Sequence, residues 1–136
     1  MEAGSPPERT VSLTIPAKPD YVVLARLALS AVSRLSPLAP EQVADLKLAI
    51  TEASNYLMGG ERRHTAREDG EEEARLTFQF EIADASLELC VSGDEKPTVS
   101  AEERELCLAL IKATVDAYEY DDGTMRLTKR LQYEAQ

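Results

Sequence analysis

The feature that most constrains this chain is the run of residues 43–58, where a helical pattern holds a carboxylate in a defined place. Its apolar residues recur at three- and four-residue steps, and they are Val43, Leu46, Ile50, Ala53 and Leu57. This spacing puts them on one face of an α-helix, which must be buried against other elements. Each residue turns the helix by about 100°, so Glu52 lies on a different side from most of them. The sequence predicts a packed helix that presents a carboxylate.

The segments around this helix define the fold class. Apolar and polar residues alternate, as they do in half-buried strands, over residues 10–15, 76–81, 87–91, 118–120 and 124–131. Two further helical patterns cover residues 20–35 and 101–116. This order predicts a two-layer α+β sandwich, in which about three helices cover one face of a mixed, mostly antiparallel sheet.

The helix expected over residues 20–35 is rich in apolar residues. Its expected buried face consists of Leu24, Leu27, Ala28, Ala31 and Leu35. Arg26, Ser30 and Arg34 recur at four-residue steps on another side, a pattern typical of a solvated face.

Composition shifts give the expected domain limits. Residues 1–8 predict a flexible tail, residues 9–132 a single domain, and residues 59–73, which have no apolar period, a mobile polar loop. His64 lies in that loop with no nucleophile or metal ligand beside it, so we do not expect it to be catalytic. The pair Asp122-Gly123 between two alternating segments predicts a hairpin with a type I′ turn.

The charge balance limits the classes of partner. There are 15 Lys and Arg against 25 Asp and Glu, a net charge of −10 that disfavours nucleic acid and anionic membranes. It suits a basic protein partner, and solubility alone explains it equally well. No apolar run approaches the ~20 residues of a membrane span, and the N-terminus lacks signal-peptide features, so we expect a cytoplasmic protein. Cys90 and Cys107 are flanked by apolar residues and are expected to be small buried hydrophobes.

Two stretches resemble a known family. The residues LAITEASNYL, 48–57, resemble the segment LAxSEAxTNA of bacterial anti-sigma factor serine/threonine kinases, which belong to the GHKL superfamily. The closing stretch LALIKATVDAYEYDDGTMRLTKRL is similar to that family's C-terminal segment, and the resemblance covers most of residues 10–131. It implies the GHKL (Bergerat) ATP-binding fold, a sandwich of the kind that the patterns predict.

The resemblance also implies a nucleotide site with a catalytic glutamate, which here is Glu52. The family's magnesium ligand is an asparagine four residues after the glutamate, whereas here Asn55 follows by three and Tyr56 occupies the fourth position. Asn55 is the candidate cofactor and metal ligand, and a phenol is a poor magnesium ligand, so we expect the metal site to be weakened.

The adenine and phosphate boxes of the family are altered. Gly93 stands where the family has its adenine-binding aspartate, and Asp94 comes one residue late; a slip of one residue in a strand reverses the side chain's face. The phosphate-binding glycines align with residues 105–107, where Glu105 would repel a phosphate about 4 Å away by roughly 4 kcal/mol at an effective dielectric of about 20. The pair Gly123-Thr124 matches the place where the family has a threonine near adenine. ATP and magnesium are therefore expected to bind weakly or not at all.

The resemblance implies partners as well. In the family an arginine of the first helix lies on the partner-binding face; Arg26 matches it, and Arg34 shares its stripe. The implied function is an anti-sigma factor of the stress response, which sequesters a sigma factor, is controlled by a STAS-type anti-anti-sigma partner and forms a homodimer. The alternative is an active kinase that uses ATP and magnesium to phosphorylate a serine of that antagonist. A third alternative is a structural or small-ligand module that has drifted from the family.

Overall fold

The computed structural model describes residues 9–36, 38–58, 74–94 and 99–131. The expected tail 1–8, the expected loop 59–73 and His64 lie outside the described residues. The elements are, in order, β1 (Arg9–Pro16), the 3-10 turn η1 (Pro19–Tyr21), α1 (Val22–Val32), α2 (Pro40–Met58), β2 (Arg75–Ile82), β3 (Ser86–Gly93), α3 (Ala101–Thr114), β4 (Ala117–Asp121) and β5 (Thr124–Arg130).

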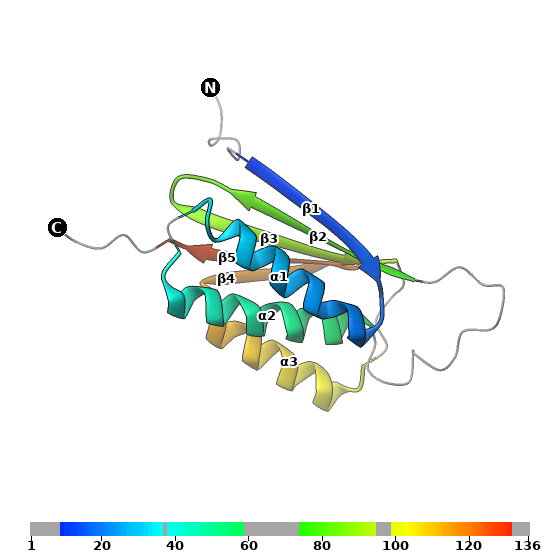
Figure 1. The fold of residues 1–136 in the computed structure, drawn as a ribbon. Coiled ribbons are helices and arrows are strands. Elements are labelled where there is room, and N and C mark those ends of the chain that lie inside the picture. Colours follow the sequence, from blue (N-terminus) through cyan, green and yellow to red (C-terminus); the bar gives the residue numbers. More distant parts are fainter. Residues whose placement is uncertain (1–8, 37, 59–73, 95–98, 132–136) are drawn as a thin grey trace, which may run out of the picture.

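The strands form one sheet in the order β1-β2-β3-β5-β4, and the three helices cover one of its faces (Figure 1). The predicted two-layer α+β sandwich is confirmed. All four strand pairings among the described residues are antiparallel, where the sequence predicted a mixed, mostly antiparallel sheet. No helix in the described part of the chain is long and apolar enough to span a membrane.

The core lies between the sheet and α2. Strand residues that face the helices are fully buried, among them Phe78, Phe80, Leu87, Leu89 and Leu127. They meet the predicted apolar stripe of α2, in which Leu46, Ile50, Ala53 and Leu57 are all buried. The opposite face of the sheet carries polar side chains and is not covered by any described helix.

The predicted buried face of α1 is wrong. Leu24, Leu27 and Leu35 are 42%, 60% and 46% exposed, and the helix instead buries Val22, Ala25, Leu29 and Val32. The sequence VVLARLALSAV is apolar around most of its circumference, so its hydrophobic period does not select a face. The small side chain of Ala25 allows the helix to approach the core closely. A row of leucines is left on the outer surface.

Local signals define the remaining boundaries. Ser100 begins α3 with a capping box: its hydroxyl accepts from the Glu103 amide, and the Glu103 carboxylate accepts from the Ser100 amide, both at 3.1 Å. The helix ends at Thr114 rather than at 116, because Val115 is extended. Asp122 and Gly123 both have positive φ, 51° and 84°, as the predicted type I′ turn requires.

Candidate functional site

Glu52 lies on α2 where this helix packs against α3, and it is half-buried. Its neighbour across the helix contact is the buried thiol of Cys107. Burial, the charge of Glu52 and a side-chain hydrogen bond to Glu52 raise the pKa of Cys107 from 9.0 to about 11. The thiol therefore stays protonated at neutral pH and faces the carboxylate.

The next turn of α2 places an aromatic side chain beside this pair. Tyr56 is only 5% exposed, and its ring packs edge-on against Tyr120 of β4 with 5.3 Å between centroids. Burial raises the pKa of Tyr56, with a nearby Arg104 opposing the shift. Asn55, the candidate magnesium ligand, is exposed on the helix. The helical position four residues after Glu52 is thus filled by a packed phenol.

Asp94, the candidate adenine ligand, is held by the end of a neighbouring strand. Its carboxylate accepts from the Arg75 amide at 3.0 Å and lies 3.8 Å from the Arg75 Nε. Just before it, the Gly93 amide donates to the carbonyl of Gly123 at 3.0 Å. Gly93 and Gly123 therefore tie β3 to the β4–β5 hairpin.

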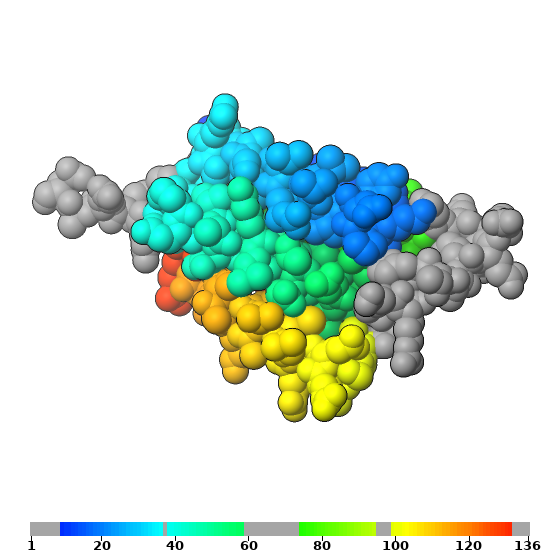
Figure 2. Space-filling view, turned by 60° about the horizontal axis from the view of Figure 1, so that its bottom comes forward, coloured from blue at the N-terminus to red at the C-terminus, as the bar shows by residue number. Residues whose placement is uncertain are grey.

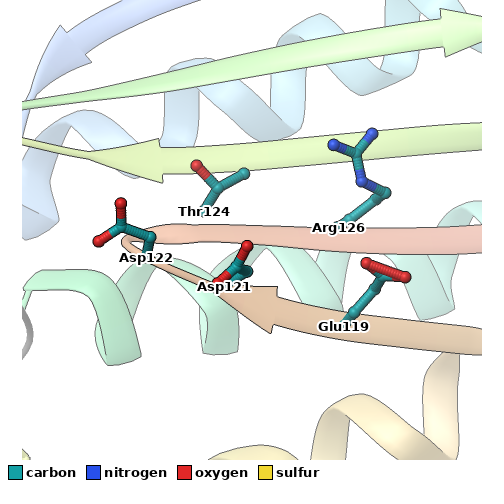
Figure 3. Close-up of a pocket in the computed structure, with 5 residues that line it drawn as sticks. All are labelled: Glu119, Asp121, Asp122, Thr124 and Arg126. Carbon is teal, nitrogen blue, oxygen red and sulfur yellow. The ribbon is translucent and has the colours of Figure 1, made fainter.

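Thr124 points to the uncovered face of the sheet. Its neighbour Met125 is buried against the helices, and strand side chains alternate. Thr124 lines an open hollow of ≈ 280 Å³ together with Glu119, Asp121, Asp122 and Arg126 (Figure 3). The structure does not bring Glu52 and Thr124 together, because the sheet separates them.

Arg26, the candidate partner residue, is half-buried between α1 and α2. Its Nη1 donates to the Thr51 hydroxyl at 3.0 Å, and Thr51 donates to the Lys47 carbonyl at 3.1 Å. Arg34 is exposed in the turn after α1. The helices α1, α2 and α3 lie on the same side of the molecule, with α2 between α1 and α3 (Figure 2).

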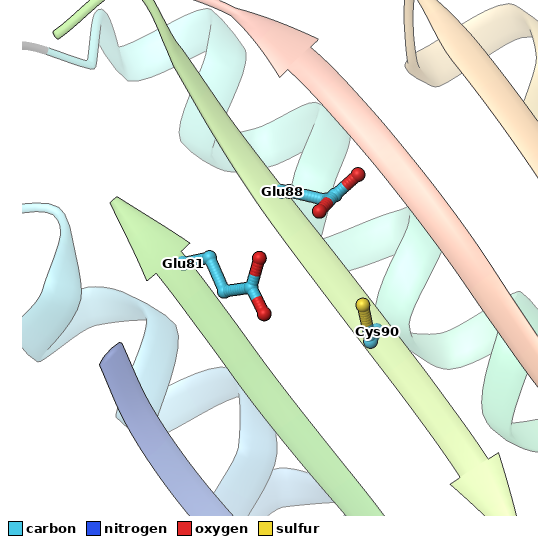
Figure 4. A group of neighbouring side chains, drawn as sticks. All are labelled: Glu81, Glu88 and Cys90. Atoms are coloured by element: carbon cyan, nitrogen blue, oxygen red, sulfur yellow. The ribbon is translucent and has the colours of Figure 1, made fainter. Parts of the chain in front are cut away.

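A second group of ionisable side chains lies on the uncovered face. The ligand atoms of Glu81, Glu88 and Cys90 lie within 4.8 Å of one another (Figure 4). Arg126 Nη1 is 3.3 Å from both Glu88 Oε1 and Cys90 Sγ, so the protein supplies its own cation here. Burial and a hydrogen bond to Glu88 raise the pKa of Glu81. Glu81 and Glu88 are direct cross-strand partners, so their like charges lie close together.

Sequence reasoning missed several of these residues. The hollow around Arg126 follows from the β4–β5 register, and the contact of Tyr120 with Tyr56 joins distant segments. One signal was available for Cys107, because it lies in the segment that aligns with the family's phosphate box. Its approach to Glu52 required the packing of α3 on α2.

Comparison with known proteins identifies the family to which the chain belongs. A profile of the histidine kinase-like ATPase domain matches residues 15–131, so the chain belongs to this family. Among its curated relatives is the serine-protein kinase RsbW of Listeria innocua, 35% identical over 84 residues, which are 62% of this chain and 50% of the relative. The RsbW of Bacillus cereus is 28% identical over 145 residues, covering 91% of this chain and 86% of that protein. The matched part spans about half the length of the first relative.

Proposed function

We propose that this protein is an anti-sigma regulatory factor, which binds and sequesters a sigma factor and is controlled by a STAS-type anti-anti-sigma partner. It acts as a cytoplasmic homodimer, and its ATP binding is weak or lost. The family membership and the similarity to serine-protein kinases RsbW support an anti-sigma kinase ancestry.

The outer face of α1 is the observation that carries this proposal. Of the exposed large apolar residues in the described chain, most lie on or beside this helix: Tyr21, Val23, Leu24, Leu27 and Leu35. A contiguous exposed apolar surface is typical of a protein–protein interface, and arginine is enriched at such interfaces. Arg26 and Arg34 flank it.

The charge of this face indicates the chemical character of the surface on the partner that would bind it. No acidic residue lies between Val22 and Val32, although the whole chain carries a net charge of −10. The partner's surface is therefore apolar, with carboxylates opposite Arg26 and Arg34. A basic partner surface, which the net charge alone suggests, would not complement this face.

Three placements support weak or lost ATP binding. Tyr56 is packed where the family has its metal ligand, Asp94 is engaged by Arg75, and Thr124 faces away from Glu52. Magnesium requires a nearly octahedral set of oxygen ligands, and on this helix only the exposed Asn55 offers an amide oxygen near Glu52. These residues do not fit a magnesium–nucleotide complex in the family's manner.

The alternative is an ATP- and magnesium-dependent serine kinase acting on the antagonist. The observation in its favour is Glu52, which is half-buried on α2 at the position that the family uses for catalysis. In that case Glu52 orients the substrate hydroxyl, and Asn55 must rotate towards it. Calorimetric titration with Mg-ATP separates the two: micromolar affinity supports the kinase, and no heat supports the binder.

Capture of sigma factors from the same bacterium tests the proposal directly. Leu27→Ser removes an exposed leucine of α1, and Leu106→Ser is a matched control on α3, since the two side chains are 60% and 62% exposed. We expect Leu27→Ser to weaken capture about tenfold, as loss of a central apolar contact does. Leu106→Ser should leave it unchanged. Equal effects of the two variants would overturn the α1 assignment.

A further inference from the structure

The strand β4 forms one edge of the sheet, and no described strand pairs with its outer side. Its inner side is fixed by the two-residue turn, which makes Asp121 and Thr124 the first hydrogen-bonded pair of the hairpin. By alternation, Glu119 bonds to β5 as well, whereas the backbone groups of Tyr118 and Tyr120 point outwards. The edge therefore offers donors and acceptors for one more strand.

The side chains along β4 divide into two kinds. Glu119 and Asp121 are exposed on the uncovered face of the sheet, and Tyr118 and Tyr120 are half-buried on the helix side. A strand added at this edge would place its alternate side chains beside the two carboxylates and the rest beside the two tyrosines.

The hollow beside β4 adds a cavity for a long side chain. It is lined by the three carboxylates of Glu119, Asp121 and Asp122 and by Arg126. The guanidinium of Arg126 is bonded to Glu88 and Cys90, and Arg126 is also the cross-strand partner of Glu119, so one positive charge is shared among these groups and the three carboxylates of the hollow outnumber it. The hollow, ≈ 280 Å³ in volume, is left acidic and opens to solvent.

We propose that the outer edge of β4 is a docking site for an extended segment of another protein in which basic and apolar residues alternate. The main chain of the segment pairs with Tyr118 and Tyr120, and its basic side chains lie over Glu119 and Asp121, with one reaching into the hollow. A second copy of this chain is excluded as the occupant through the same edge, because its carboxylates would face these carboxylates.

The test uses a fluorescent peptide of about seven residues, a usual strand length, in which lysine and valine alternate. Anisotropy should show saturable binding to the full-length protein. A permuted peptide, with lysines and valines in separate blocks, should bind at least about tenfold more weakly, because it cannot place charges and apolar groups on opposite faces.

Matched variants locate the site. Glu119→Gln with Asp121→Asn should weaken binding about tenfold, since each lost cross-strand pair contributes a few-fold. Asp20→Asn with Glu41→Gln makes the same chemical change at exposed positions on other elements and should leave binding unchanged. Melting curves confirm that both proteins are folded.

Hydrogen exchange tests the backbone contacts. The amides of Tyr118 and Tyr120 should exchange fast in the free protein and become protected with the alternating peptide, which attraction between charges alone would not cause. Absence of binding would mean that the acidic edge only prevents aggregation, and would overturn the proposal. Equal binding of the permuted peptide, equal loss in both double variants, or unprotected amides would overturn it as well.

Discussion

The two flanks of the molecule differ in a way that the overall composition hides. The α1 flank is apolar, with Arg26 and Arg34 and no acid along the helix, whereas the β4 flank is polar and carries Glu119, Asp121 and Asp122. A net charge of −10 therefore does not describe either surface. The comparison teaches that partner chemistry must be read from each face, because electrostatic complementarity acts over about a Debye length, roughly 8–10 Å.

The comparison assumes that the outer leucines of α1 serve binding and not folding. Leu29→Ala empties a fully buried site and should lower the free energy of unfolding by about 2–5 kcal/mol. Leu27→Ala, at an exposed position two residues away, should change it by less than about 0.5 kcal/mol. Urea unfolding measures both. A large loss in Leu27→Ala would show that this face is covered in the native protein.

Charge reversal at Arg26 tests the basic character of the same flank. Arg26→Glu should weaken sigma-factor capture about tenfold, because it places a carboxylate opposite the partner's carboxylates. Thr51→Val is the control, since it removes the hydroxyl that holds the guanidinium and keeps the charge. Binding by biolayer interferometry, with a melting curve for each variant, gives the result. Unchanged capture by Arg26→Glu would remove this residue from the interface.

Substitutions at the tip of the β4–β5 hairpin test whether the β4 flank can be destabilised without affecting binding at the α1 flank. In Gly123→Ala the new Cβ has room, because its nearest neighbour is the Gly93 carbonyl oxygen at 3.6 Å. The φ of +84° at this position, however, is strained for any residue other than glycine. We expect a loss of about 1 kcal/mol in thermal or urea unfolding. Asp122→Asn, at φ 51°, should be nearly neutral because asparagine tolerates this region. Sigma-factor capture through α1 should be the same in both variants.

The contact between α2 and α3 lies between the two flanks. The smallest effect that we expect is the pH dependence of the free energy of unfolding that Cys107 causes at this contact. The pKa of Cys107 is about 11 in the folded protein and 9.0 ordinarily, so above pH 9 the unfolded chain loses its proton first. Stability should then fall as pH rises from about 9 to 11, and Cys107→Ala should flatten part of this decline in urea titrations under reducing conditions.

Glu52→Gln is the partner variant for this measurement. It removes a charge that raises the Cys107 pKa, and it should flatten the decline less than Cys107→Ala does, because burial remains the larger cause. If stability declined with pH in Cys107→Ala as it does in the unchanged protein, the raised pKa of Cys107 would not be the cause of the decline.

Sequence patterns were sufficient where one physical signal dominates. The stripe of α2 selects one face, and Asp122-Gly123 permits few turns other than type I′, so both were predictable. For α1 the sequence contains two apolar faces, and only packing against the sheet decides between them. The face on which Thr124 lies depends on the strand register, which no single segment specifies. The candidate site depended on such long-range contacts more than the fold did.

The aromatic pair of Tyr56 and Tyr120 gives the molecule an internal optical reporter. The chain has five tyrosines and no tryptophan, so no indole masks their emission. Tyr56 shares α2 with Thr51, which holds Arg26, and its ring touches the strand at the other flank. A shift of α2 under a ligand at either side would alter the packing of these rings, and the ultraviolet fluorescence of the unlabelled protein would record it.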